Sequence, residues 1–184
     1  MRLLSLDGAG TRNLLRAAWC QELATRLKRI PAIQEVLPSD AVTTQCTYFH
    51  KSESNNWLVA LHRDLSIPVK ARVSSEDWTA WSEKEGVLFA HPPQVVLESV
   101  VAVRLHLEEN THNNSPLQVV PGSHAGATSR AERVTCLVPR GGVLIMSPLL
   151  LHASSKLKSG TRRVLHFVFG PHELPNKAEW AHAV

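Results

Sequence analysis

A histidine and an aspartate stand two positions apart in the segment Leu61-His62-Arg63-Asp64. Residues 57–64 have the apolar and β-branched composition of a strand, in which residues two apart point to the same face. His62 and Asp64 would then offer an imidazole nitrogen and a carboxylate oxygen to one metal ion. Alone the pair is weak evidence, because such neighbours more often form a surface or hydrogen-bonded pair.

A third ligand is available further along the chain. Two imidazoles and one carboxylate form the facial triad that binds Fe(II) and leaves other positions open. Among the ten histidines, His152 is the best placed, because it ends a predicted apolar strand at 149–153. Arg162 follows ten residues later. A guanidinium group binds a carboxylate through two hydrogen bonds, so this arginine suits the distal carboxylate of 2-oxoglutarate.

With these residues in place, the chain resembles the phytanoyl-CoA dioxygenase family of Fe(II)- and 2-oxoglutarate-dependent oxygenases, from about residue 13 to residue 180. The resemblance depends on the order and spacing of several short segments, none of which is specific alone. These segments are Asn56-Trp57 before His62-Arg63-Asp64, Arg104-Leu105-His106-Leu107 followed by Asn114, Leu117-Gln118-Val119-Val120-Pro121-Gly122-Ser123-His124, and His152-Ala153-Ser154 followed by Arg162-Arg163-Val164-Leu165-His166.

The resemblance implies a fold and a site. The fold is a double-stranded β-helix, a jelly-roll or cupin-like barrel, with iron at one mouth. His62, Asp64 and His152 would hold the iron, Arg162 would bind the distal carboxylate of 2-oxoglutarate, and Ser154 would touch this cosubstrate.

Two further arginines belong to the predicted cosubstrate site. Arg163 is the alternative clamp, because a shift of one residue in the preceding loop would exchange it with Arg162. Arg104 matches a family position near the cosubstrate, with an ordinary structural arginine as the equal alternative. His124, in a Pro-Gly-Ser-His turn, and the remaining histidines are interpreted as structural.

The implied reaction is hydroxylation of a small organic substrate by Fe(II), 2-oxoglutarate and O2, with release of succinate and CO2. Halogenating relatives replace the carboxylate ligand by a small residue, whereas Asp64 is present here. Family members usually carry more chain before the first helix, so a segment that encloses the substrate is expected to be missing or replaced. The alternatives are a barrel that binds metal or a carboxylate without turnover, and a structural protein with incidental histidines.

The expected elements form a mainly β protein with an N-terminal helix, in one domain over residues 1–184. Leu15, Trp19, Leu23 and Leu27 recur every fourth residue, which predicts a helix over 13–30 that ends at Pro31 and packs on a β-barrel core at 42–170. Residues 75–86 are expected to form a loop or short helix. Predicted strands cover 42–49, 57–64, 95–107, 117–120, 134–138, 143–146, 149–153 and 162–169.

Composition excludes several classes of protein. The 184 residues include 20 Lys and Arg against 16 Asp and Glu, a net charge of +4 that marks no nucleic-acid-binding stripe. The three cysteines have no Cys-x-x-Cys spacing, so neither a disulfide framework nor a zinc site is expected. The apolar run at 142–151 is shorter than the roughly 20 residues of a membrane helix. A cytoplasmic protein is expected, of undetermined oligomeric state.

Two other motifs fail on their context. Residues 6–12 resemble the glycine-rich oxyanion loop of patatin-like lipases, but no Gly-x-Ser-x-Gly nucleophile segment follows. His62-Arg63-Asp64-Leu65 matches the start of a kinase catalytic loop, yet Val69 stands where the magnesium-binding Asn is required.

Overall fold

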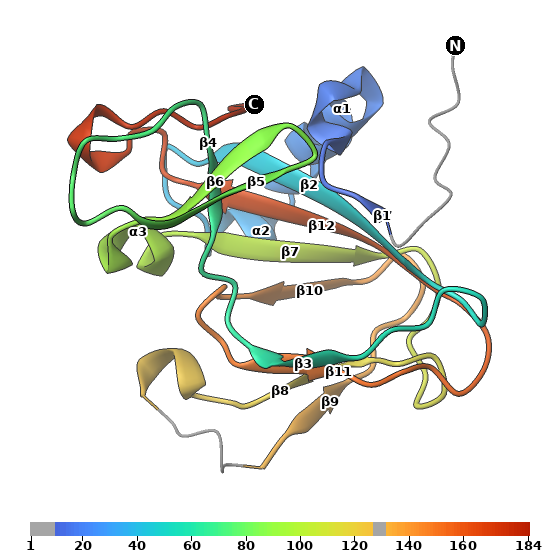
Figure 1. The fold of residues 1–184 in the computed structure, drawn as a ribbon. Coiled ribbons are helices and arrows are strands. Elements are labelled where there is room, and N and C mark those ends of the chain that lie inside the picture. The colour runs from blue at the N-terminus through green and yellow to red at the C-terminus, as the bar shows by residue number, and fades with distance from the viewer. Residues whose placement is uncertain (1–9, 127–131) are drawn as a thin grey trace.

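Two β-sheets face each other in the computed structural model, which describes residues 10–126 and 132–184 (Figure 1). The larger sheet has the strand order β1-β2-β12-β7-β10, and the smaller has the order β3-β11-β8-β9. Their bounds are β1 Gly10–Thr11, β2 Val42–Lys51, β12 Arg162–Gly170, β7 Val101–His106, β10 Val143–Met146, β3 Val59–His62, β11 His152–Ser154, β8 Leu117–Val119 and β9 Val134–Cys136. This is the double-stranded β-helix, so the predicted mainly β fold with an N-terminal helix is confirmed.

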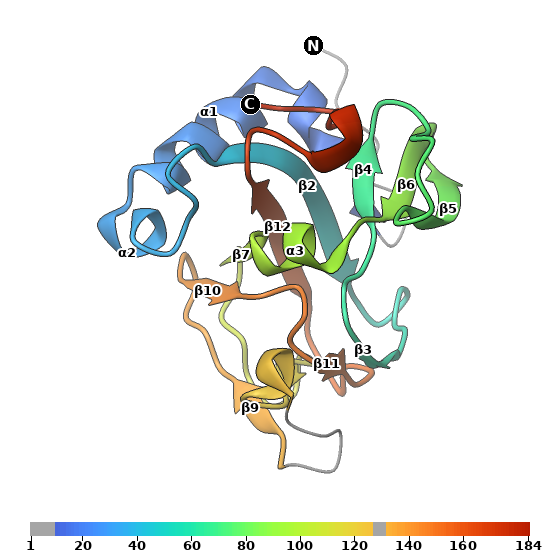
Figure 2. The ribbon, with the colours of Figure 1, turned by 90° about the vertical axis from the view of Figure 1, so that its left-hand side faces the viewer.

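Helices cover the outer face of the larger sheet (Figure 2). They are a 3-10 turn η1 (Leu14–Arg16), α1 (Ala18–Lys28) and α2 (Pro31–Gln34). Cys20, Ala24 and Leu27 of α1 are buried against the outward side chains of the sheet, among them Phe167 and Phe169 of β12. Because side chains alternate along a strand, the intervening residues of β2, β7 and β12 face inward, between the two sheets.

A third, three-stranded sheet stands beside the barrel mouth (Figure 1). Its order is β4 (Ile67–Val69), β6 (Val87–His91) and β5 (Thr79–Lys84). Trp78 and Trp180 are buried in the cluster that joins this sheet to α3 (Gln94–Glu98). Two further 3-10 turns are η2 (Ser123–Ala125) and η3 (Pro175–Lys177).

The predicted helix over 13–30 is broken. Ala17 has extended backbone (ψ 128°) between η1 and α1, so Leu15 and α1 do not share one helical phase. Trp19 is consequently 50% exposed, whereas its neighbour Cys20 is fully buried. Pro31 begins α2 in the first helical position, where its missing N–H costs no hydrogen bond.

Three other expectations on secondary structure are wrong. Residues 94–98 form α3 rather than the start of a strand, since Pro93 caps a helix that buries Val96 and Leu97. The loop expected at 75–86 contains β5, which ends in a tight turn where Glu85 and Gly86 have φ of 53° and 72°. His152 begins β11 instead of ending a strand at 149–153, because Leu150 N–H donates to the Ser147 carbonyl in a turn.

Most of the lipase-like segment at 6–12 lies outside the described residues, which begin at Gly10. Within the described ranges, no helix has the length and apolar character needed to cross a membrane.

Candidate metal centre

The side chains of His62, Asp64 and His152 meet at the mouth of the barrel. One ligand atom from each lies within 4.8 Å of the other two. Asp64 Oδ1 is 3.4 Å from His62 Nε2, and Oδ2 is 3.6 Å from His152 Nε2. The structure therefore brings together the three residues predicted as ligands.

Strand pairing produces this convergence. His62 ends β3 and pairs with His152 of the antiparallel neighbour β11. Asp64 lies beyond the end of β3, which is shorter than the predicted strand, and its N–H donates to the Pro148 carbonyl at 2.9 Å. Between the two ligands, Arg63 turns away and donates to the carbonyls of Leu149 at 2.8 Å and Ser123 at 2.9 Å. Arg63 thus fastens the ligand segment to the turn before β11.

Both imidazoles are oriented by the backbone. His62 Nδ1 lies 2.9 Å from the Ala60 carbonyl oxygen, and His152 Nδ1 lies 2.9 Å from the Leu150 carbonyl oxygen. A carbonyl can only accept, so each Nδ1 carries a proton and Nε2 is the ring nitrogen that faces Asp64. Metal-binding histidines are commonly held in this way by a hydrogen bond from the other ring nitrogen.

The carboxylate is ionised. Burial by itself raises the pKa of Asp64, but the hydrogen-bonding contact with His62 outweighs it and holds the pKa below its ordinary value. Burial lowers the pKa of His152, which favours its neutral form. Two imidazole nitrogens and one ionised carboxylate suit Fe(II) of the non-haem type.

A cavity of about 460 Å³ opens beside these ligands. The inward side chains of the larger sheet form its floor, and the third sheet contributes one wall. The floor residues are Gln45, Thr47, Phe49, Arg104, Arg162 and His166. This size and mixture of polar and apolar groups are typical of sites for small molecules.

One end of the cavity is basic and buried. Arg162 is 3% exposed and donates through Nη1 to the Ser115 carbonyl, while its Nε has no partner among the described residues. Beside it in the strand pairing lies the fully buried Lys51, whose Nζ donates to Ser154 Oγ at 2.9 Å, Ser115 Oγ at 3.0 Å and the Ser155 carbonyl at 2.7 Å. Burial and the charge of Arg162 lower the pKa of Lys51 to about 7.

Arg104 lines the same cavity from β7. Its Nη1 donates to His166 Nδ1 at 3.0 Å, and its guanidinium lies 5.5 Å from the centre of the Phe49 ring. Burial and the charge of Arg104 lower the pKa of His166 to about 3, so His166 is neutral. Since Nδ1 accepts, the ring proton is on Nε2.

Two other candidates lie elsewhere. Arg163 points to the opposite face of β12 from Arg162, is exposed, and pairs with Glu108. It does not line the cavity. His124 is exposed in η2 and takes no part in the metal-ligand cluster.

The sequence-based prediction missed Lys51 and His166. Lys51 continues the inward alternation of Gln45, Thr47 and Phe49, but the strand was expected to end at Phe49. His166 shares the inward face of β12 with Arg162, a spacing of four that signals a common face. Extending the first strand by two residues would have found Lys51, and alternation within the predicted strand 162–169 already put His166 on the face of Arg162.

Comparison with known proteins defines the class. Fold and site are those of a double-stranded β-helix with a two-histidine, one-carboxylate cluster. The family model described as Phytanoyl-CoA dioxygenase (PhyH) matches residues 13–165, and the chain therefore belongs to this family. No curated protein matches the chain.

Solved structures of similar fold share little sequence. AviO1 from Streptomyces viridochromogenes Tue57 is 20% identical with a TM-score of 0.60, over 91% of this chain and 68% of AviO1. HygX from Streptomyces hygroscopicus, with nickel and 2-oxoglutarate bound, is 15% identical with a TM-score of 0.59, over 88% of this chain and 69% of HygX. EvdMO1 is 20% identical with a TM-score of 0.60, over 90% of this chain and 36% of EvdMO1. The chain thus spans about two thirds of AviO1 and HygX and about one third of EvdMO1.

Proposed function

We propose that this protein is an Fe(II)- and 2-oxoglutarate-dependent dioxygenase that hydroxylates a small organic substrate. The observation that carries the proposal is the meeting of His62, Asp64 and His152 beside a cavity whose far end holds the buried Arg162. Family membership supports the class of reaction. HygX structures with iron, or with nickel and 2-oxoglutarate, support the choice of metal and cosubstrate.

His62 and His152 would bind the iron through Nε2, and Asp64 through a carboxylate oxygen. All three are prepared for this, because the backbone holds both Nδ1 protons and Asp64 is ionised. When bound, Fe(II) with 2-oxoglutarate and O2 supplies the oxidising chemistry that puts a hydroxyl on a C–H carbon as 2-oxoglutarate becomes succinate and CO2.

Arg162 would bind the distal carboxylate of 2-oxoglutarate, Ser154 would contact it, and the charge of Lys51 behind them would attract it. Burying a cation without an acidic partner is costly, so Arg162 in the cavity lining, with Lys51 beside it in the strand pairing, favours an anionic ligand there. Arg104, which lines the same cavity from β7, would also contact the cosubstrate. Arg163 has no role in this site.

The experiment is anaerobic reconstitution with Fe(II), addition of 2-oxoglutarate under nitrogen, and then admission of oxygen. We expect bound iron, uncoupled formation of succinate, and loss of iron in His62→Ala. A protein that consumes no 2-oxoglutarate, together with a His62→Ala variant that binds iron as the wild type does, would contradict the proposal. Binding of 2-oxoglutarate without succinate would instead favour a barrel that binds metal or carboxylate without turnover.

A further inference from the structure

Two basic side chains line the cavity away from its cosubstrate end. Arg12 follows β1, in which Thr11 pairs with Tyr48, so Arg12 lies beside Thr47. Thr47 is four residues along β2 from Lys51, about 13 Å at the rise of a strand. Lys84 ends β5, in the wall that the third sheet contributes.

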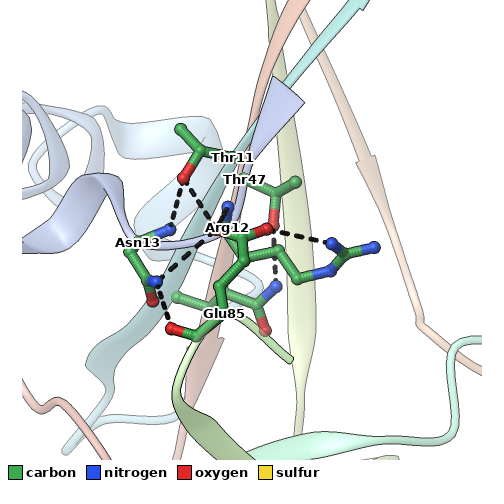
Figure 3. Close-up of polar contacts among 6 residues, drawn as sticks. Thr11, Arg12, Asn13, Thr47 and Glu85 are labelled. Carbon is green, nitrogen blue, oxygen red and sulfur yellow. Dashed lines mark hydrogen bonds and ion pairs between the residues drawn. The ribbon is translucent and has the colours of Figure 1, made fainter. Parts of the chain in front are cut away.

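Glu85 fixes the position of Arg12 (Figure 3). From the β5–β6 turn its carboxylate accepts hydrogen bonds from Thr11 Oγ1 at 2.8 Å, Arg12 N at 2.9 Å and Arg12 Nη1 at 3.1 Å. Asn13 Nδ2 donates to the Glu85 carbonyl at 3.0 Å. The turn and the segment 11–13 therefore hold each other against the cavity, and the guanidinium keeps its remaining N–H groups for a further acceptor.

Lys84 has no ion pair with any acidic side chain of residues 10–126 and 132–184. Its Nζ lies 4.8 Å from the centre of the Phe89 ring. Burial and the positive charge of Arg12 lower the pKa of Lys84, while the charge of Asp64 opposes this shift. Of the described side chains that line the cavity, Asp64 alone is acidic, and the metal would use it.

Apolar side chains form part of the cavity wall. Ile67, Phe89, Leu97 and Val100 line it. Given the proposed function, on which this inference rests, we propose that the substrate is a small amphipathic acid whose carboxylate or phosphate group lies between Arg12 and Lys84. Its apolar part then extends along this wall and presents a C–H bond near His62, Asp64 and His152.

Anion binding tests this without turnover. Titration calorimetry measures the affinity of the protein for benzoate, for its neutral analogue benzamide and for inorganic phosphate. The protein is loaded with Ni(II) and saturated with 2-oxoglutarate, so that the cosubstrate end of the cavity is already filled. The variants are Lys84→Gln and, as the matched control, Lys158→Gln, an exposed lysine outside the cavity. The same comparison of variants is made without metal.

We expect benzoate or phosphate to bind, benzamide to bind more weakly, and Lys84→Gln to weaken the anion by about tenfold, as expected for one lost charged contact. Lys158→Gln should bind as the wild type does. Binding of benzoate but not phosphate would indicate a substrate with a carboxylate group. Binding of phosphate but not benzoate would indicate a phosphate ester. Equal affinities in wild type and Lys84→Gln, or no anion binding at all, would overturn the inference. If the protein bound neither Ni(II) nor 2-oxoglutarate, the proposed function itself would be refuted, and this outcome is distinct from a failure of the anion site.

Discussion

His62 and His152 are direct cross-strand partners, and the centres of their imidazole rings lie 4.3 Å apart. Residues 90 positions apart in the chain are placed together by one antiparallel pair of strands, β3 and β11. Asp64, just past the end of β3, supplies the third side chain of the cluster. The geometry of the cluster thus depends on backbone pairing and on Arg63, as well as on the ligands themselves.

Arg162→Gln should raise the Kd for 2-oxoglutarate by at least about thirtyfold, because removing one partner of a buried charge pair costs about 2–5 kcal/mol. Its neighbour provides the control: Arg163→Gln should change this Kd little, since Arg163 is exposed and pairs with Glu108. Calorimetry on the Ni(II) form measures both. Equal losses in the two variants would contradict the assignment of Arg162.

Binding of 2-oxoglutarate should weaken as pH rises above about 7. Burial and the charge of Arg162 lower the pKa of Lys51 to about 7, so the free protein loses this proton there, whereas the negative charge of a carboxylate bound at Arg162 favours its retention. The Kd should then rise by up to about tenfold per pH unit.

The stability of the ligand-free protein should change with pH in the opposite direction to its affinity for 2-oxoglutarate. Because the unfolded chain keeps the Lys51 proton to higher pH than the folded chain, the free energy of unfolding without ligand should increase from pH 7 upward on this account. Lys51→Met should bind 2-oxoglutarate with a flatter pH dependence. A wild-type Kd independent of pH between 7 and 9 would be evidence against a role for Lys51.

Arg63→Ala should lower metal affinity by about tenfold or more although Arg63 is no ligand, because groups that orient ligands commonly matter to this extent. It removes two hydrogen bonds that fasten the His62–Asp64 segment to the carbonyls of Leu149 and Ser123. Competition with a chromophoric chelator measures the Co(II) affinity. Arg140→Ala, at an exposed position, is the control and should have no effect.

Gly170→Ala should destabilise the fold by about 1–3 kcal/mol, the usual cost of overpacking a core. A methyl group there would lie 2.6 Å from Cζ2 of Trp180, a buried ring fixed by a hydrogen bond to the Pro171 carbonyl. Urea unfolding measures the change in the free energy of unfolding. An unchanged midpoint would show that Trp180 moves without cost.

The sequence predicted the ligand cluster because its chemistry is local: a His and an Asp two apart, and a His followed by an inward-facing Arg. The resemblance added the fold. Alternation also separated Arg162 from Arg163, whose faces differ. The rest depended on tertiary contacts. The polar residues of β5 form a strand because β6 pairs with them. Val96 and Leu97 are helical because Pro93 starts a helical turn. The break at Ala17 removes Trp19 from the buried face of the helix.

In the proposed site, His62, Asp64 and His152 together hold one metal ion. Anomalous diffraction from crystals grown with Ni(II) and 2-oxoglutarate tests it most directly. We expect a single strong nickel peak bonded to Nε2 of His62, Nε2 of His152 and a carboxylate oxygen of Asp64. We also expect 2-oxoglutarate to extend from this peak toward Arg162. A crystal without nickel at these three side chains, or with nickel bound only elsewhere, would contradict it.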